Sequence, residues 1–414
     1  MSGTPTSQLT PPVLDDFDPY NPVFRADPYP EYDRIREMGG PVYWEYLDSY
    51  LVASHADATA VLAEPGLRVQ PPPEVAEMLL SMVPTELHPM QQTLLFQDPP
   101  DHTRLRNLTR RAFSSSAIAG ALAEARRTAR TILDRAVRSG RLEVVDELAF
   151  PVSLQVIGDL LGVPRSDLPL LKEWGQALSP AADIPAAAGS LERALEGFQA
   201  FDDYFGRLAE RRRRDPGEDL FTALVQAETE GVISRAELHA NAILTFISGH
   251  ETLVAFAASA FLCFLRRPDQ LTLLRERPEL AANTVDEVLR YESPLQLATA
   301  GGGRWTREDL VVGDHVIPAG QRVLVLLAAA NRDPAVYTDP HRFDILRPGY
   351  RHLALGHGLH FCVGAVLARQ QGSMIMEELA ATRAEFEAGL TELSWMPLFM
   401  QRRLATLPLR VHPR

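Results

Sequence analysis

The stretch LALGHGLHFCVGAVLAR, Leu353–Arg369, places Cys362 between a segment rich in glycine and histidine and the start of an apolar helix. Cys362 is one of only two cysteines in the chain. A thiolate is a soft ligand that suits haem iron, and one thiolate is sufficient as the axial ligand. The N-terminus of a helix favours negative charge, which helps to keep the sulfur ionised. The segment is therefore a candidate haem-thiolate site.

The flanking residues allow other interpretations of the same stretch. His360 can donate a hydrogen bond to an anionic propionate, and Gly356, Gly358 and Gly364 permit tight turns and close approach to a flat ring. Taken alone, however, the stretch is equally compatible with a buried structural cysteine. A zinc site that uses His357 and His360 is less well supported, because a structural zinc ion normally takes four ligands.

Composition sets the bounds of the function. The chain has 414 residues, of which 46% are hydrophobic and 23% are charged, as in an ordinary globular protein. Its net charge of −13 argues against a nucleic-acid partner. Two cysteines cannot form a disulfide framework, and the N-terminal stretch has neither a basic nor an apolar leader region. We therefore expect a soluble, cytoplasmic protein without a membrane segment.

The pattern along the chain is mostly helical. We expect residues 1–26 to be a loosely ordered, proline-rich lead-in and residues 27–414 to form a single domain. Helical spacing dominates from residue 101 to about residue 292, and the most apolar helix begins at Ser234 and ends at Pro268. Short strands follow residue 294, and an earlier hairpin turns at residues 47–49. Residues 66–97 are expected to form a long, loop-like lid. The fold class is thus mainly α with a small β part.

Three further segments carry polar groups in suggestive patterns. Glu287 and Arg290 are three residues apart on one helix face and can pair, although such pairs are common on protein surfaces. The segment FISGHETL places Glu251 and Thr252 in the middle of the apolar helix, where burial of polar groups is costly without a role. In DPPDHTRLR, His102 and Arg106 are one helical turn apart.

Together these segments resemble the soluble bacterial members of the cytochrome P-450 family. The stretch around Cys362 matches the family's haem-binding loop, F-x-x-G-x-[HR]-x-C-x-G, except that Leu355 replaces the phenylalanine. The other three segments resemble the family's E-x-x-R pair, its [AG]-G-x-[DE]-T motif and its D-P-P-x-H-T-x-x-R helix, in family order. The resemblance covers residues from about 27 to 411.

The resemblance implies roles for individual residues. Cys362 would be the axial ligand of the haem iron, a metal site, within the loop of Gly358, His360 and Gly364. Propionate contacts would come from His102, Arg106 and Arg304. A buried structural network would join Glu287 and Arg290 to Arg342 of DPHRFD. Thr252 and Glu251 would be catalytic, in oxygen activation. The substrate pocket would include the following residues: Ala242, Phe246, Ile247, Leu295, Leu297 and Phe399.

The resemblance also implies a fold and a reaction. The fold is a helix-rich triangular prism, with haem b between the long central helix and the helix that carries the cysteine. The expected enzyme is a monooxygenase that inserts one oxygen atom from dioxygen into an apolar small molecule, such as a polyketide or macrolide. Electrons from NAD(P)H would arrive through a separate ferredoxin and its reductase, and we expect a monomer. Two alternatives stay open: the same haem used as a peroxygenase or for oxidative coupling, and a non-enzymatic haem-binding protein.

Overall fold

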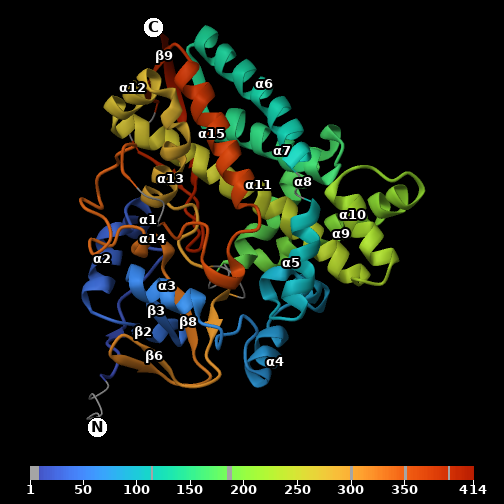
Figure 1. Ribbon diagram of the computed structural model, residues 1–414, viewed down its shortest axis with the longest axis vertical. Coiled ribbons are helices and arrows are strands. Elements are labelled where there is room, and N and C mark those ends of the chain that lie inside the picture. Colours follow the sequence, from blue (N-terminus) through green and yellow to red (C-terminus); the bar gives the residue numbers. More distant parts are fainter. Residues whose placement is uncertain (1–8, 113–114, 184–188, 299–301, 349–351, 390–391) are drawn as a thin grey trace.

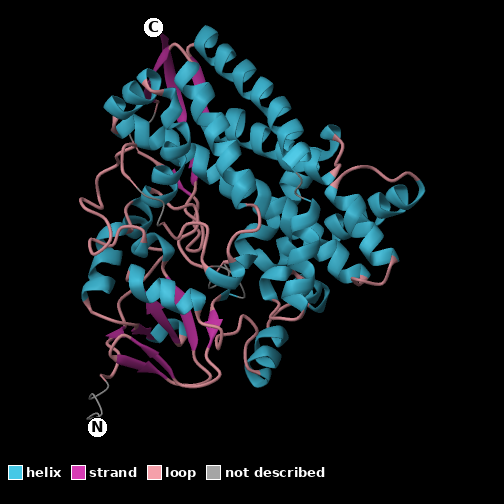
Figure 2. Ribbon diagram, in the orientation of Figure 1, coloured by secondary structure: helices cyan, strands magenta, loops and turns pink. Residues whose placement is uncertain are grey.

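The computed structural model describes residues 9–112, 115–183, 189–298, 302–348, 352–389 and 392–414 (Figure 1). Helices account for most of this part of the chain (Figure 2). The α-helices are α1 Pro22–Ala26, α2 Tyr29–Glu37, α3 His55–Ala63, α4 Pro73–Ser81, α5 Asp101–Ala112, α6 Ser115–Ser139, α7 Phe150–Leu161, α8 Leu168–Leu178, α9 Ser190–Arg214, α10 Leu220–Thr229, α11 Arg235–Arg266, α12 Pro268–Glu276, α13 Ala281–Tyr291, α14 Leu327–Ala330 and α15 Ala365–Ala381.

The long helix α11 lies at the centre of the helical part and packs against α7, α9, α13 and α15 (Figure 1). It begins with the predicted capping box: the Ser234 side chain accepts a hydrogen bond from the Glu237 amide, and the Glu237 carboxylate accepts one from the Ser234 amide. It ends at Arg266, two residues before Pro268, the residue that was predicted to close the helix and that begins α12. By length and composition α11 is the one described helix that could cross a membrane, but 78% of its apolar window is buried inside the protein. It is therefore a core helix.

The β part is small; its largest sheet lies to one side of the long helices, whereas the three-stranded sheet β4-β12-β9 packs beside α6 (Figure 2). Its largest sheet has the order β1-β2-β3-β8-β5, in which β2 and β3 form the predicted hairpin and β3 runs parallel to β8. The hairpin turns through Asp48, whose φ of 45° is left-handed. The strands are β1 Val13–Leu14, β2 Val42–Trp44, β3 Ser49–Val52, β4 Arg141–Glu143, β5 Arg304–Trp305, β6 Leu310–Val312, β7 His315–Ile317, β8 Arg322–Val325, β9 Ala384–Ala388, β10 Ser394–Trp395, β11 Leu404–Thr406 and β12 Pro408–Pro413.

The N-terminal segment is more ordered than its composition suggested. Residues 1–8 lie outside the described part, but β1 pairs in parallel with β2, and Leu14 and Phe17 are buried. Phe17 makes ring contacts with Trp44 and Phe399. For residues 9–26 the prediction of a loose lead-in is therefore wrong, because their apolar side chains complete the core beside the sheet.

Residues 66–97 are also more regular than predicted. They form α4 and two 3-10 helices, Thr85–Gln92 and Leu94–Phe96, separated by prolines and short turns. None of the residues of α4 is fully buried, and the helix projects from the body of the protein (Figure 1). The prediction of a mainly helical fold with a small β part is confirmed; the loop-like lid is instead a chain of short helices.

Candidate active site

The loop before α15 holds Cys362 in a defined backbone frame. Gly356 and Gly358 have φ angles of 74° and 68°, and a Cβ at Gly358 would lie 2.3 Å from the carbonyl oxygen of Leu62 in α3. The Cys362 amide donates to the carbonyl of Leu355 at 2.9 Å. Gly364, by contrast, has an ordinary φ of −88°. The first two glycines are therefore required by the turn and by close packing on α3, and Gly364 is not required for its φ.

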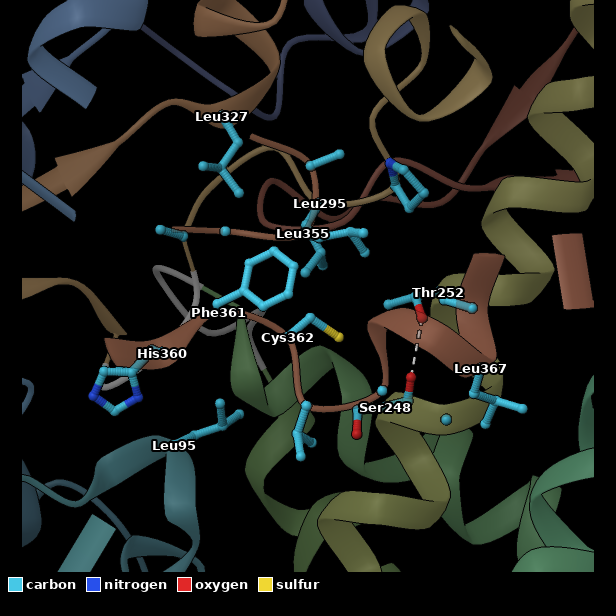
Figure 3. A pocket seen from close by; sticks show the side chains of 18 of the residues that line it. Leu95, Ser248, Thr252, Leu295, Leu327, Leu355, His360, Phe361, Cys362 and Leu367 are labelled. Atoms are coloured by element: carbon cyan, nitrogen blue, oxygen red, sulfur yellow. Dashed lines mark hydrogen bonds between the residues drawn. The ribbon is translucent and has the colours of Figure 1, made fainter. Parts of the chain in front are cut away.

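The Cys362 side chain borders a large cavity between this loop and α11 (Figure 3). The cavity offers about 230 Å³ to the centres of water-sized groups, whereas a single water needs roughly 10–15 Å³ measured in this way. Burial raises the pKa of the Cys362 thiol, and the Gly364 amide and the charge of Arg106 oppose that rise. The sulfur thus has room in front of it for a much larger group and has positive partners that favour its ionised form.

A set of buried nitrogens lies at one side of this cavity. His102 is completely buried, and its ring lies 4.2 Å from the ring of His360. Within the described residues, none of the four ring nitrogens has a hydrogen-bond partner. Burial and the charge of Arg106 lower the pKa of His102 to about 4, whereas burial and the charge of Arg304 lower that of His360 to about 2.

The same side carries two guanidinium groups, Arg106 and Arg304, which line the cavity. Burial lowers the pKa of Arg304 to about 10. Buried polar atoms are normally hydrogen-bonded, so two orphaned imidazoles beside two arginines match a ligand that carries anionic oxygens. Haem fits this donor set, because it carries two anionic propionates and an iron that accepts a thiolate ligand.

On the opposite wall, α11 presents hydroxyl groups to the cavity. The Thr252 hydroxyl donates to the carbonyl of Ser248 at 3.0 Å, and the Ser248 hydroxyl donates to the carbonyl of Leu244 at 2.6 Å (Figure 3). The Thr252 hydroxyl therefore bonds back to the helix carbonyl four residues earlier. Thr245, which the sequence analysis did not single out, lines the same wall one turn before Ser248.

The carboxylate of Glu251 does not line the cavity. It is buried, lies 3.2 Å from the Arg403 guanidinium and 3.6 Å from the ring of His250. Burial raises the pKa of Glu251, but contact with His250 and the charge of Arg403 outweigh it, and the pKa falls below its ordinary value. Glu251 is thus held as a carboxylate on the side of α11 that faces β11.

Two of the six predicted pocket residues, Leu295 and Leu297, line the cavity. Phe246 is buried against Phe201 and His250, and Phe399 belongs to the aromatic cluster around Phe17.

Ala242 is buried in the core, and Ile247 lies near Gly175 of α8. None of these four residues lines the cavity, and on α11 Phe246 and Ile247 point about 120° and 140° away from Thr252. Their place in the substrate pocket stays a prediction. Leu94, Leu95 and Leu244 contribute to the wall instead.

The predicted charge network is present, with one different member. Arg290 donates two hydrogen bonds to Glu287, at 2.7 and 2.8 Å, and both side chains are 2% exposed. The third partner is Arg347, 3.2 Å from Glu287. Arg342 is 55% exposed, and its guanidinium lies 3.9 Å from Asp344. The prediction of Arg342 is wrong, because its backbone carbonyl, not its side chain, faces the network and accepts from Arg290 and Arg347.

Comparison with known proteins is consistent with this geometry. A profile of the family Cytochrome P450 matches residues 27–380. The cytochrome P450 monooxygenase PikC of Streptomyces venezuelae is 36% identical over 413 residues, which cover 97% of this chain and 95% of PikC.

Two solved structures share the fold. The structure of P450BioI in complex with hexadec-9Z-enoic acid ligated acyl carrier protein has a TM-score of 0.86 at 32% identity, covering 94% of this chain and 99% of that one. The bacillaene polyketide synthase cytochrome P450 PksS of Bacillus subtilis 168 has a TM-score of 0.85 at 28% identity, covering 96% and 100%. The chain therefore belongs to the cytochrome P450 monooxygenase family.

Proposed function

We propose that this enzyme is a haem-thiolate monooxygenase that hydroxylates or epoxidises an apolar natural product such as a polyketide or macrolide. One observation carries the proposal: a cysteine and a hydroxyl-bearing helix face each other across one cavity, which His360 also lines, and the ring of His102 packs against that of His360. In hydroxylation, substrate-H, dioxygen, two electrons and two protons give substrate-OH and water. The haem supplies the iron at which dioxygen is activated.

The residues of the loop and of α5 have binding roles in this proposal. The Cys362 thiolate holds the iron, and the adjoining Gly364 amide and Arg106 favour its negative charge. His102 and His360 donate to the propionates, which gives partners to buried nitrogens that otherwise lack them.

Proton delivery is assigned to α11. The hydrogen of the Thr252 hydroxyl is used in the bond to Ser248, so its oxygen lone pairs are available to a water in the cavity. A water held there is positioned for proton transfer to the reacting oxygen. Glu251 is the adjacent acid, and its contact with Arg403 holds it away from the cavity. Resupply of protons by Glu251 therefore requires its carboxylate to leave Arg403.

The proposed substrate and partners rest on the chemistry of the cavity lining and on similarity to known proteins. The cavity is lined by many leucines, together with Ile157 and Phe256, which suits an apolar substrate. PksS belongs to a polyketide synthase and P450BioI binds an acyl carrier protein, and we extend the polyketide class to this chain. Electrons reach the protein from NAD(P)H through a ferredoxin and its reductase, and the enzyme acts as a cytoplasmic monomer.

Isotope labelling tests the reaction class. The purified protein, a ferredoxin, its reductase and NADPH are incubated with a panel of macrolides and fatty acids under ¹⁸O-labelled dioxygen. Monooxygenation predicts one ¹⁸O atom in the product by mass spectrometry. Label that enters only from ¹⁸O-labelled hydrogen peroxide identifies a peroxygenase, and coupled products without new oxygen identify oxidative coupling; either result would overturn the proposal.

A further inference from the structure

Three hydroxyl groups form a row along the cavity wall of α11. Thr245, Ser248 and Thr252 all line the cavity and follow one another at spacings of three and four residues. Each hydroxyl donates to the carbonyl four residues earlier: Thr245 to Asn241 at 2.7 Å, Ser248 to Leu244 at 2.6 Å and Thr252 to Ser248 at 3.0 Å. A hydroxyl has one hydrogen and two lone pairs. With the hydrogens engaged in the helix, the row offers acceptors to the cavity.

Thr245 is held in place by a second set of bonds. Asn241, whose carbonyl it contacts, is 3% exposed and uses its side chain fully. The Asn241 amide oxygen accepts from the Leu94 amide at 2.9 Å, and its nitrogen donates to the carbonyls of Glu237 at 2.8 Å and Gln92 at 3.2 Å. Residues 92–94 are thereby tied to α11 at the turn that carries Thr245. The acceptor at Thr245 therefore has a fixed place in the wall.

The surroundings of this acceptor are apolar. Leu94, Leu95, Leu244 and Ile157 contribute to the same cavity, whereas the arginines and His360 that line it are the candidates for propionate contacts. An apolar neighbourhood around a fixed acceptor favours a neutral ligand with a hydrogen-bond donor. It disfavours a ligand that presents a carbonyl or carboxylate at that point, since two acceptors then face each other without a proton.

The helix sets the distance between the two ends of such a ligand. Thr245 and Thr252 are seven residues apart, which corresponds to about 10 Å along the axis at roughly 1.5 Å per residue. Thr252 is the residue to which we assign proton delivery at the reacting oxygen. A ligand anchored at Thr245 thus carries its donor on the order of 10 Å from the atom that is oxidised.

We propose that Thr245 is a specificity-determining residue that accepts a hydrogen bond from a hydroxyl group of an otherwise apolar, uncharged substrate. This inference rests on the proposed function and narrows its substrate class to hydroxylated compounds. Loss of one such hydrogen bond costs about 0.5–1.5 kcal/mol, which corresponds to roughly a 2- to 13-fold change in affinity.

Binding of alkylimidazoles to the haem-loaded protein tests this without turnover. The probes are 1-alkylimidazoles of six to twelve carbons that end in a methyl group or in a hydroxyl group, and binding is followed by the shift of the Soret band. The imidazole anchors one end at the iron, so only certain lengths bring the terminal hydroxyl to Thr245. We expect the hydroxyl-to-methyl affinity ratio of the wild-type protein to rise at those lengths.

The variants separate the hydroxyl from the shape of the side chain. Thr245→Val keeps the shape and should abolish the rise, about 2- to 13-fold, while the affinities of the methyl series stay unchanged. Thr245→Ser keeps the acceptor and should retain it. A ratio that is independent of length, or that is the same in Thr245→Val and wild type, would overturn the inference but leave monooxygenation intact. Absence of a Soret shift with every probe would show that a ligand lying along α11 does not reach the iron, and would overturn the inference.

Discussion

Replacement of Arg347 by methionine should destabilise the protein by about 2–3 kcal/mol, whereas Arg342→Met should change its stability by less than about 0.5 kcal/mol. Arg347 is 12% exposed, and its Nε lies 3.2 Å from the buried Glu287 carboxylate. It also donates to the carbonyls of Thr338 at 2.6 Å, Asp339 at 3.1 Å and Arg342 at 2.9 Å.

The magnitude follows from what the network retains. Complete loss of the partner of a buried charge costs about 3–5 kcal/mol. Here Glu287 keeps the two hydrogen bonds from Arg290 and one from the Asp344 amide at 2.9 Å, so its charge stays compensated. Arg347→Met then removes one charge-assisted hydrogen bond, which is worth about 1.5–3 kcal/mol. The carbonyls that Arg347 contacts can bond to water in the variant, so they add little to this cost.

The assay is equilibrium unfolding in urea, followed by tryptophan fluorescence, with both variants and the wild type loaded with haem. Arg342→Met is the matched control. It removes the same charge five residues before Arg347, and the Arg342 side chain is 55% exposed. Equal stability of the two variants would refute the assignment of Arg347 to the network. Greater destabilisation by Arg342→Met would restore the partner expected from the sequence.

Three further outcomes are expected. Thr252→Ala should bind haem and substrate normally and consume reductant, but release hydrogen peroxide in place of product; an unchanged yield of product per electron would remove Thr252 from proton delivery. Hydrogen exchange of α4, residues 73–81, should slow several-fold when a substrate binds, while residues 92–94 change little because Asn241 holds them; exchange that is unaffected by a tight ligand would exclude α4 as a lid. His102→Leu should lower the haem content severalfold without destabilising the apoprotein, because it removes buried nitrogens that lack partners there; full haem retention would contradict the propionate role.

Local patterns in the sequence predicted the elements that carry the site. The capping box at Ser234 and Glu237 and the apolar spacing that follows define α11 from neighbouring residues alone. The turn of the Cys362 loop is also local, since the left-handed glycines Gly356 and Gly358 and the start of α15 lie within a few positions of the cysteine. These features depend on short-range geometry, which sequence spacing describes well.

Rotation about α11 explains why Phe246 and Ile247 do not line the cavity. At 3.6 residues per turn, Thr245 points within about 20° of Thr252, whereas Phe246 and Ile247 point about 120° and 140° away. Counting from Thr252 would therefore have identified Thr245 as part of the wall. Phe399 is different: its place beside Phe17 depends on how the N-terminal segment meets the sheet, and no spacing in the sequence encodes that contact.

The charge network around Glu287 could not be predicted fully for a similar reason: its third member comes from an irregular segment. Arg342 and Arg347 lie five residues apart between α14 and the cysteine loop, in a part of the chain without helical or strand periodicity. The Arg347 side chain turns inward because the backbone carbonyls of residues 338, 339 and 342 accept its hydrogen bonds. Such a choice requires the tertiary path of the chain.

The carbon monoxide spectrum of the reduced protein tests the central claim most directly. Thiolate ligation by Cys362 predicts the strongly red-shifted Soret band of a haem-thiolate protein in the wild type and its loss in Cys362→Ser. The matched control is Cys263→Ser, since Cys263 is buried within α11, where burial raises the pKa of its thiol. That variant should keep the band. A red-shifted band that persists in Cys362→Ser, or that disappears in Cys263→Ser alone, would contradict the assignment of Cys362 as the ligand of the haem iron.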